Sequence, residues 1–466
     1  MSDDVAFAGA ARIAEMVRAK EVSPTELVEL YLDRIAALEP KLNAYRVVLA
    51  EGARADAKRA EERLAKGDDA PLLGVPVAIK DNIDYADEVT ADGTAAYGEP
   101  ATEDGHVVRR LREAGATILG KTNLPELAIY GFTESPTWGA TRNPWDTSRT
   151  TGGSSGGSGA ATAAGMCAMA HATDGAGSIR YPAAFCGLFG LKPQRNRISM
   201  SPDREHWYGL SVSGCVSRTV MDTALYLDVM SGGEKGDMDV PPPFERPLVE
   251  AARTSPGKLR VACTTKTATP VKKAPEVLAA YEETIELLRS LGHEVTEAAP
   301  PYSRARIDFF PMYFRGIRDE ALTLPHAEKL SDQTKGFVRL GRLFSDRRMN
   351  KVRDKLPGAA AKIQGFFRDF DVLLTPATAQ PPFEVGKLLG KGTLNTMNRM
   401  ANVYPYGFRW NYTGQPAAAI PAGFTDDGLP RSVMLISRPS REDVLVSLGA
   451  QIEAERPWAD RRPPVD

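Results

Sequence analysis

The chain has 466 residues and a formal net charge of -2, with 42% hydrophobic and 25% charged side chains. This composition is that of a globular protein, and the balance of charge excludes a basic surface for nucleic acid. No apolar run approaches the roughly 18 residues that a membrane-spanning helix needs, and the acidic N-terminus is unlike a secretory signal, so neither a membrane nor a nucleic-acid partner is expected.

Residues 1–70 are predicted to form a helical arm. Ser23-Pro24-Thr25-Glu26 is a capping box with proline at the first helical position, and Pro40 is expected to end this helix. The apolar face of the helix is formed by Val28, Tyr31, Leu32, Ile35 and Leu38. A second, charged helix is expected from about residue 51 to residue 66, before Gly67.

Residues 71–233 are predicted to form the catalytic core. The apolar run 72–80 indicates a buried strand that ends at Lys80. A helix over residues 107–113 is expected to lead into a strand over residues 116–120. Alternation of helices with buried strands favours an α/β sheet that is covered by helices on both faces.

The rest of the chain is predicted to complete the same domain. Residues 234–300 are expected to be a connection and a continuation of the core, and residues 301–370 a variable helical region that forms the substrate pocket. Residues 371–466 are expected to supply the last core strands and a C-terminal helix. The predicted fold is therefore a single large α/β domain with a mixed, mostly parallel central sheet, an N-terminal helical arm and a helical insertion.

The segment from Thr151 to Arg180 is rich in glycine and serine at both ends. A flexible linker is the usual result of such a composition, but two observations argue against it. Residues 160–170, between the glycine-rich ends, are good helix formers, and residues 179–191 are apolar enough to require burial. The glycines are therefore expected to serve tight turns and a close approach of the backbone to a bound molecule.

The histidines and cysteines do not predict a metal site. None of the five histidines lies in an H-x-x-x-H or H-E-x-x-H pattern, so no metal and no other cofactor is expected. The cysteines Cys167, Cys186, Cys215 and Cys263 are widely spaced and lie mostly in apolar contexts. This pattern is typical of reduced thiols in a cytoplasmic protein.

Several motifs along the chain match one family. They are Gly153-Ser-Ser-Gly-Gly157, Asp174-Gly-Ala-Gly-Ser-Ile-Arg180, Gly187-Leu-Phe-Gly-Leu-Lys-Pro193, Leu73-Gly-Val-Pro-Val-Ala-Ile-Lys-Asp81 and Gly120-Lys-Thr-Asn-Leu-Pro-Glu126. Together these motifs resemble the amidase signature family, and the resemblance covers most of the chain except residues 234–260 and 300–368. A motif set of this length is more specific than any single pattern.

The resemblance implies a serine hydrolase that works without histidine. In that family's scheme Ser178 is the nucleophile, Ser154 the bridging serine and Lys80 the base. These residue types suit the chemistry, because a serine hydroxyl is a poor nucleophile until a neighbouring base takes its proton. Lysine can be that base only when it is neutral, which requires burial to lower its pKa by about three units.

The glycine turn before the nucleophile is expected to bind the oxyanion of the reaction. Its expected donors are the backbone N–H groups of Gly175, Ala176, Gly177 and Ser178. Supporting roles around this turn are expected for Ser155, Asp174 and Arg180. The family commonly has glycine where this chain has Ala176, so a left-handed backbone at that position would be strained.

The function implied by the resemblance is hydrolysis of a carboxylic amide C–N bond through a seryl acyl-enzyme. An apolar or aryl small-molecule amide is expected as the substrate, with a carbamate or an oligomeric or cyclic amide as alternatives. This expectation rests on aromatic side chains that could line a pocket or be buried in the core, among them Tyr130, Phe132, Phe309 and Trp410.

Two other functions remain open at this point. The chain could be the A subunit of a glutamine-dependent tRNA amidotransferase, or an inactive member of the family that serves as a binding scaffold. The intact set of Lys80, Ser154 and Ser178 argues against the scaffold. The oligomeric state is also open, with a homodimer as one option.

Overall fold

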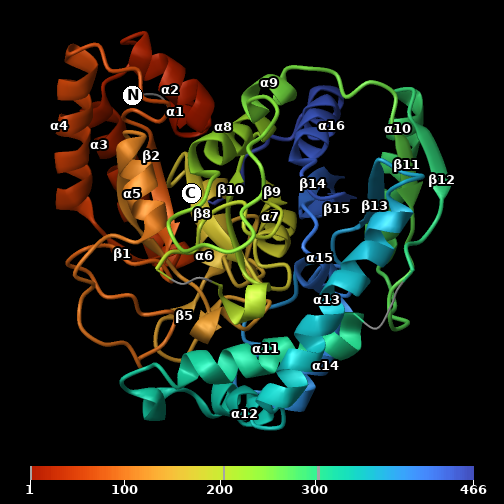
Figure 1. Ribbon diagram of the computed structural model, residues 1–466. Helices are drawn as coiled ribbons and strands as arrows, with labels where there is room; N and C mark the ends of the chain where they lie inside the picture. The colour runs from red at the N-terminus through yellow and green to blue at the C-terminus, as the bar shows by residue number, and fades with distance from the viewer. Residues whose placement is uncertain (1–2, 203–204, 302–304, 466) are drawn as a thin grey trace.

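The computed structural model describes residues 3–202, 205–301 and 305–465 (Figure 1). Its centre is a sheet of eleven strands within these described ranges. In spatial order the strands are β1 (Tyr45–Val48), β3 (Thr117–Thr122), β2 (Pro76–Lys80), β8 (Met169–Asp174), β10 (Val212–Ser217), β9 (Phe189–Lys192), β14 (Ala417–Phe424), β15 (Pro430–Ser437), β13 (Val372–Pro376), β11 (Arg260–Cys263) and β12 (Glu294–Glu297). Two small sheets lie outside it, formed by β4 (Glu134–Ser135) with β5 (Gly139–Ala140) and by β6 (Arg142–Asn143) with β7 (Asp146–Thr150).

The sheet is mixed, as predicted, but the expected majority of parallel strands is wrong. Among the described strands of this sheet, four neighbouring pairs are parallel and six are antiparallel. The parallel pairs lie toward the two edges, where helices cross over between β2 and β3 and between β11 and β12. In the middle, loops and a hairpin connect β9 to β10 and β14 to β15, and such connections produce antiparallel neighbours.

Helices cover both faces of this sheet, as predicted. The ring of Phe189 in β9 lies beside α8 and α16, whereas the next residue, Gly190, faces Ala183 in α7. Because successive residues of a strand point to opposite faces, α7 lies on one face and α8 and α16 on the other. The helices that surround the sheet are α5 (His106–Glu113), α6 (Gly156–Ala163), α7 (Arg180–Cys186), α8 (Val220–Met230), α9 (Leu248–Ala252), α10 (Pro275–Ser290) and α16 (Glu442–Glu455).

The N-terminal arm consists of four helices that group together at one side of the molecule in Figure 1. They are α1 (Asp3–Ala6), α2 (Ala10–Arg18), α3 (Pro24–Leu42) and α4 (Ala50–Ala65). The predicted capping box begins α3, since the Ser23 hydroxyl accepts from the Glu26 N–H and the Glu26 carboxylate accepts from the Ser23 N–H. Pro40 does not end the helix as expected: it lies in the last turn, and the helix continues to Leu42, before Asn43 in a left-handed conformation.

The predicted helical region between residues 301 and 370 forms a layer of its own, with α11 and α12 along the bottom of the molecule in Figure 1. Its helices, with the two that pack on them, are α11 (Ala305–Ala321), α12 (Asp332–Gly341), α13 (Asp346–Phe366), α14 (Thr393–Val403) and α15 (Phe408–Thr413). They enclose a second, aromatic core that includes Phe309, Tyr313 and Phe337 and reaches Tyr130 and Phe132. Within the described ranges, no helix is long and apolar enough to cross a membrane.

The alanine-rich segment folds differently from the prediction. Helix α6 begins earlier than expected, at Gly156, and ends at Ala163, while the segment from Met169 onward is strand β8 instead of helix. This strand pairs with β2 on one side and with β10 on the other. The helix ends at a turn in which Gly165 has a φ of 65°, and at Met169 and Ala170 pairing with two strands outweighs the helix preference of the segment. The consequence is that Asp174 ends a strand next to the one that ends at Lys80.

Candidate active site

Lys80 is the last residue of β2 and is fully buried. Its Nζ forms hydrogen bonds with Ser154 Oγ at 2.7 Å and with Thr173 Oγ1 at 2.8 Å. Burial lowers the pKa of Lys80 to about 7, although the negative charges of Asp92, Asp174 and Glu320 oppose this shift. A large fraction of Lys80 is therefore neutral at neutral pH and can accept a proton.

Ser154 lies in the glycine-rich loop between β7 and α6, where the Gly153–Ser154 peptide bond is cis. The backbone of residues 130–132 packs tightly on this loop: a Cβ at Gly153 would come within 2.6 Å of the Tyr130 carbonyl oxygen. Ser155 ties the loop to β8, because its hydroxyl donates to the Thr173 carbonyl at 3.2 Å. Its N–H also donates to the Ser178 carbonyl at 3.3 Å. Ser155 thus holds the two serine segments together, in line with a supporting role.

The turn from Asp174 to Ser178 is organised by the Asp174 carboxylate. Asp174 and Arg180 form a buried ion pair at 2.9 Å, and Asn411 Nδ2 donates to Asp174 Oδ1 at 2.9 Å. The N–H of Ile179 also donates to this carboxylate, at 3.2 Å. Burial by itself would raise the pKa of Asp174, but Arg180, the charge of Lys192 and the Asn411 amide hold it at about 2. The carboxylate is charged at any working pH and has a structural role at the base of the turn.

Gly177 does not fit its predicted role as an oxyanion donor. Its N–H donates to Asp174 Oδ1 at 2.6 Å, and a backbone N–H has only one hydrogen to offer. The candidate donors are therefore reduced to the N–H groups of Gly175, Ala176 and Ser178. Gly177 is the residue that requires glycine, since its φ is 136° and a Cβ there would overlap the ring of Tyr181. Ala176 is outside the residues with positive φ, so it replaces the family's glycine without strain.

An apolar cavity of about 120 Å³ opens beside Ser178, Ala176 and Gly153. Tyr130 and Phe309, both predicted for the pocket, line it. The prediction was wrong for the other two aromatics: Phe132 stacks against Tyr130 inside the second core, and Trp410 is buried in the main core. Lining residues that the sequence did not predict include Tyr181, Trp207, Tyr313, Phe337, Met397, Met400, Tyr404 and Phe408.

Three residues around Lys80 were missed by the sequence analysis. Thr173 accepts from Lys80 Nζ, and Asn82 Nδ2 donates to the same Thr173 hydroxyl at 3.2 Å. His171 accepts from the Lys80 backbone N–H at 3.3 Å, and burial lowers its pKa to about 3, so it stays neutral. His171 and Thr173 alternate along one strand and therefore share a face, but this signal depends on recognising β8 as a strand.

The described residues contain no cluster of three or more His, Cys, Asp or Glu side chains that could hold a metal ion. The four cysteines, Cys167, Cys186, Cys215 and Cys263, are free and buried. Of the three predicted reacting residues, Lys80 is joined to Ser154 by a hydrogen bond, and the loop of Ser154 is linked to Ser178 through the Ser155 N–H.

Known proteins resemble this chain over nearly its whole length. The family model described as Amidase matches residues 26–446. The Mycobacterium bovis protein called "Putative amidase AmiB2" is 49% identical over 465 residues, which are 99% of each chain. The solved structure of 6-aminohexanoate cyclic dimer hydrolase complexed with substrate superimposes with a TM-score of 0.90 at 32% identity, covering 99% of each chain. A bacterial aryl acylamidase of the amidase signature family superimposes with a TM-score of 0.85 at 25% identity, covering 97% of this chain and 96% of the other.

Proposed function

This chain belongs to the amidase family and acts on amide C–N bonds, and we propose that Ser178 is its nucleophile, Ser154 the proton bridge and Lys80 the base. The observation that carries the proposal is the 2.7 Å contact between the buried Lys80 Nζ and Ser154 Oγ. Burial lowers the pKa of Lys80 to about 7, which supplies a neutral amine. Ser178 lines the apolar cavity together with Gly153 of the same loop.

Acylation begins with the transfer of two protons. Neutral Lys80 takes the proton of Ser154, and Ser154 takes the proton of Ser178. At the same time the Oγ of Ser178 forms a bond to the amide carbon. The carbonyl oxygen becomes an oxyanion, which accepts hydrogen bonds from the N–H groups of Gly175, Ala176 and Ser178. When the C–N bond breaks, Ser154 returns a proton to the leaving nitrogen and regains one from Lys80. The products of this step are a free amine and an ester at Ser178.

Deacylation repeats the sequence with water in place of the serine. Lys80 and Ser154 remove a proton from a water molecule, whose oxygen attacks the ester carbonyl. Breaking the ester bond releases the carboxylic acid and returns the proton to Ser178. Thr173 supports both steps, because it accepts an N–H of Lys80 and so directs the amine's lone pair toward Ser154.

The substrate proposed for this site is a small amide with an uncharged, apolar or aryl acyl group. The residues that line the cavity beside Ser178 are apolar, aromatic or small, and none of them carries a charge in the described part of the chain. A charged acyl group would lose its hydration there without gaining a partner. A cyclic or oligomeric amide is an alternative within this class, since a structural relative is a cyclic dimer hydrolase.

The A subunit of a tRNA amidotransferase is not favoured as an alternative, because the relative that is 49% identical over 99% of each chain carries an amidase name. We also propose the cytoplasm as the compartment, since all four cysteines are free thiols. A homodimer remains a proposal that gel filtration would test.

A hydrolysis panel combined with active-site labelling tests the proposed function. Purified enzyme is offered aryl anilides, aliphatic amides, glutamine, carbamates and cyclic amides, and anilides should give the highest kcat/KM. A fluorophosphonate should add one adduct, which maps to Ser178 and is absent from Ser178→Ala. An adduct on Ser154 or on a cysteine would contradict the assignment of the nucleophile, and a preference for glutamine would contradict the substrate class. An enzyme that neither labels nor hydrolyses any amide would support the binding scaffold instead.

A further inference from the structure

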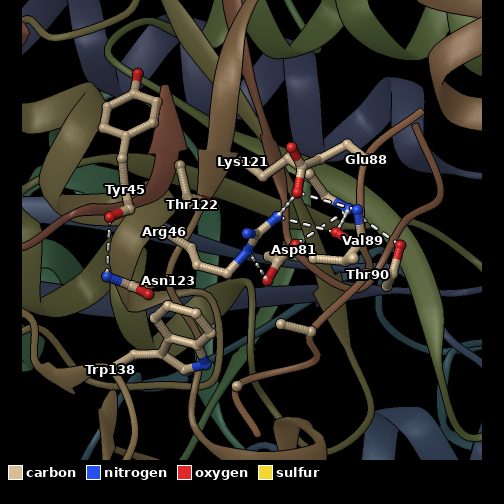
Figure 2. Close-up of polar contacts among 12 residues, drawn as sticks. Tyr45, Arg46, Asp81, Glu88, Val89, Thr90, Lys121, Thr122, Asn123 and Trp138 are labelled. Atoms are coloured by element: carbon tan, nitrogen blue, oxygen red, sulfur yellow. Dashed lines mark hydrogen bonds and ion pairs between the residues drawn. The ribbon is translucent and has the colours of Figure 1, made fainter. Parts of the chain in front are cut away.

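A cluster of buried charges lies immediately next to Lys80 (Figure 2). Asp81, the residue after Lys80, forms ion pairs with Arg46 Nε at 2.6 Å and with Lys121 Nζ at 3.1 Å. Arg46 Nη2 also pairs with Glu88 at 3.0 Å. The side chains of Asp81 and Lys121 are 1% and 0% exposed, and that of Arg46 is 6% exposed. Two cations thus balance two carboxylates at the edge of the sheet formed by β1, β3 and β2.

The cluster fixes the loop that leaves β2, which comprises residues 81–92. The Val89 carbonyl accepts hydrogen bonds from both Arg46 Nη2 and Lys121 Nζ, each at 2.9 Å. Lys121 Nζ donates further to Thr90 Oγ1 at 3.0 Å, so this ammonium contacts the Asp81 carboxylate, the Val89 carbonyl and the Thr90 hydroxyl. Figure 2 shows these contacts converging on one side of the loop.

The two ends of this loop meet at Asp81. The Asp92 N–H donates to the Asp81 carbonyl at 3.1 Å, and the Asp81 N–H donates to the Thr122 carbonyl at 3.1 Å. Asp92 has a φ of 46°, a left-handed conformation that aspartate adopts more readily than most residues other than glycine. The backbone preference of Asp92 and the surrounding hydrogen bonds therefore agree on the shape of the loop.

The fixed loop presents two residues toward Lys80. Asn82 donates to the Thr173 hydroxyl, which in turn accepts from Lys80 Nζ. An ionised Asp92 would raise the pKa of Lys80, but burial and the neighbouring Glu320 hold the pKa of Asp92 itself well above its usual range. Both residues also line a larger cavity of about 590 Å³, which shares Trp207 with the apolar cavity beside Ser178.

Stability by itself does not account for the cluster. Burial raises the pKa of Asp81, and Lys121 and Arg46 only counteract that rise. Replacing buried ion pairs of this kind by packed apolar residues is often neutral or stabilising, so a buried pair is weak evidence of a gain in stability. What the cluster does supply is a tie between the loop and the sheet, because Arg46 and Lys121 each contact Asp81 and also donate to the Val89 carbonyl.

We propose that Asp81 is a positioning residue for catalysis: through the loop 81–92 it holds Asn82 against Thr173 and thereby fixes Lys80 for proton transfer. The proposal rests on the role of Lys80 as base in the proposed function. Displacing a reacting group by about 1 Å can cost about 10²-fold in rate, so small movements of this loop are sufficient to affect the chemistry. The effect should appear in kcat, because the apolar cavity that binds the acyl group is not part of the cluster.

A double-mutant cycle separates positioning from general damage to the fold. Asp81→Asn is introduced into the wild type and into Lys80→Ala, and the rate at which a fluorophosphonate labels Ser178 is measured in folded samples. In the wild type the substitution should slow labelling by about 10- to 100-fold and lower kcat for an anilide with little change in KM. In Lys80→Ala it should have almost no further effect, because the group that it positions is absent.

Two further variants keep the test decisive. Asp222 is an equally buried aspartate that caps α8, so Asp222→Asn should lower the melting temperature without slowing the labelling of folded enzyme. If Asp81→Asn does not fold, Asn82→Leu removes the contact with Thr173 and should show the same dependence on Lys80. Equal losses in both backgrounds, or no loss in the wild type, would overturn the proposal. Full activity of Lys80→Ala alone is a different result, which would refute the base itself.

Discussion

Replacing Lys80 by methionine should remove activity and at the same time stabilise the fold at neutral pH. Burial lowers the pKa of Lys80 from 10.5 to about 7, which corresponds to roughly 5 kcal/mol against the ammonium at 1.36 kcal/mol per pKa unit. The hydrogen bonds to Ser154 and Thr173 are lost in the variant and together offset about 2 kcal/mol. The expected net gain in the unfolding free energy at pH 7 is roughly 2–3 kcal/mol.

The difference in unfolding free energy between Lys80→Met and the wild type should change with pH in a direction that follows from the lowered pKa of Lys80. Between about pH 7 and 10.5 the unfolded wild-type chain holds the proton of Lys80 and the folded chain does not. The stability of the wild type therefore rises with pH across this window, whereas methionine has no proton to lose. Urea unfolding at pH 7 and at pH 10 should show the advantage of Lys80→Met shrinking or reversing at the higher pH.

The kinetic part of the prediction uses the same variant. Lys80→Met should lower kcat/KM for an anilide by at least about 10²- to 10⁴-fold, and Lys80→Arg should not restore it, because guanidinium stays charged. The wild-type rate should rise through pH 7 as the lysine loses its proton. Lys192 offers a matched control: it is fully buried with its pKa lowered to about 7 by burial, but its amine donates to the Pro193 carbonyl instead of to a serine. Lys192→Met should reproduce the stability effect and retain activity.

Two results would refute this reasoning. An active Lys80→Met enzyme would remove the lysine from the mechanism. A wild-type rate that falls between pH 6 and 8 would show that the protonated form of Lys80, and not the neutral amine, is required.

Three further predictions concern the pocket and the oxyanion turn. Phe309→Ala should raise KM for anilides by about 10-fold and leave KM for short aliphatic amides unchanged, as steady-state kinetics would show. Phe132→Ala should instead lower the unfolding free energy by about 3–5 kcal/mol, measured by urea unfolding, without changing KM. Gly177→Ala should lower both kcat and the melting temperature, because it strains a φ of 136° and collides with Tyr181; an unaffected kcat would contradict the described turn. Ala176→Gly should leave kcat nearly unchanged and cost at most about 1 kcal/mol in thermal unfolding, and a large gain in kcat would instead show that alanine distorts the oxyanion site.

Much of this protein is determined locally and was therefore accessible from the sequence. The capping box at Ser23 fixes the start of α3, and the helix expected over residues 107–113 forms as α5 (His106–Glu113), because caps and apolar periodicity act within a few residues. The motifs around Lys80, Ser154 and Ser178 predicted these three residues as the reacting groups, and the structure places Lys80 Nζ against Ser154 Oγ. The strand before Lys80 was also recognisable, since a short apolar run bounded by glycine and proline suits a buried strand.

Only the tertiary structure decided how these pieces are used. Thr173 meets Lys80 because β8 pairs with β2, and that pairing overrides the helix preference of the residues before it. The Gly177 N–H donates to the Asp174 carboxylate and is therefore not available to an oxyanion, and only the folded conformation of the turn shows this. Tyr130 faces the cavity and Phe132 the core although both are large aromatics in one short segment. The hydrophobic effect favours burial of both rings but does not determine which way either ring points. Which ring lines the cavity therefore depends on neighbours that come from distant parts of the chain.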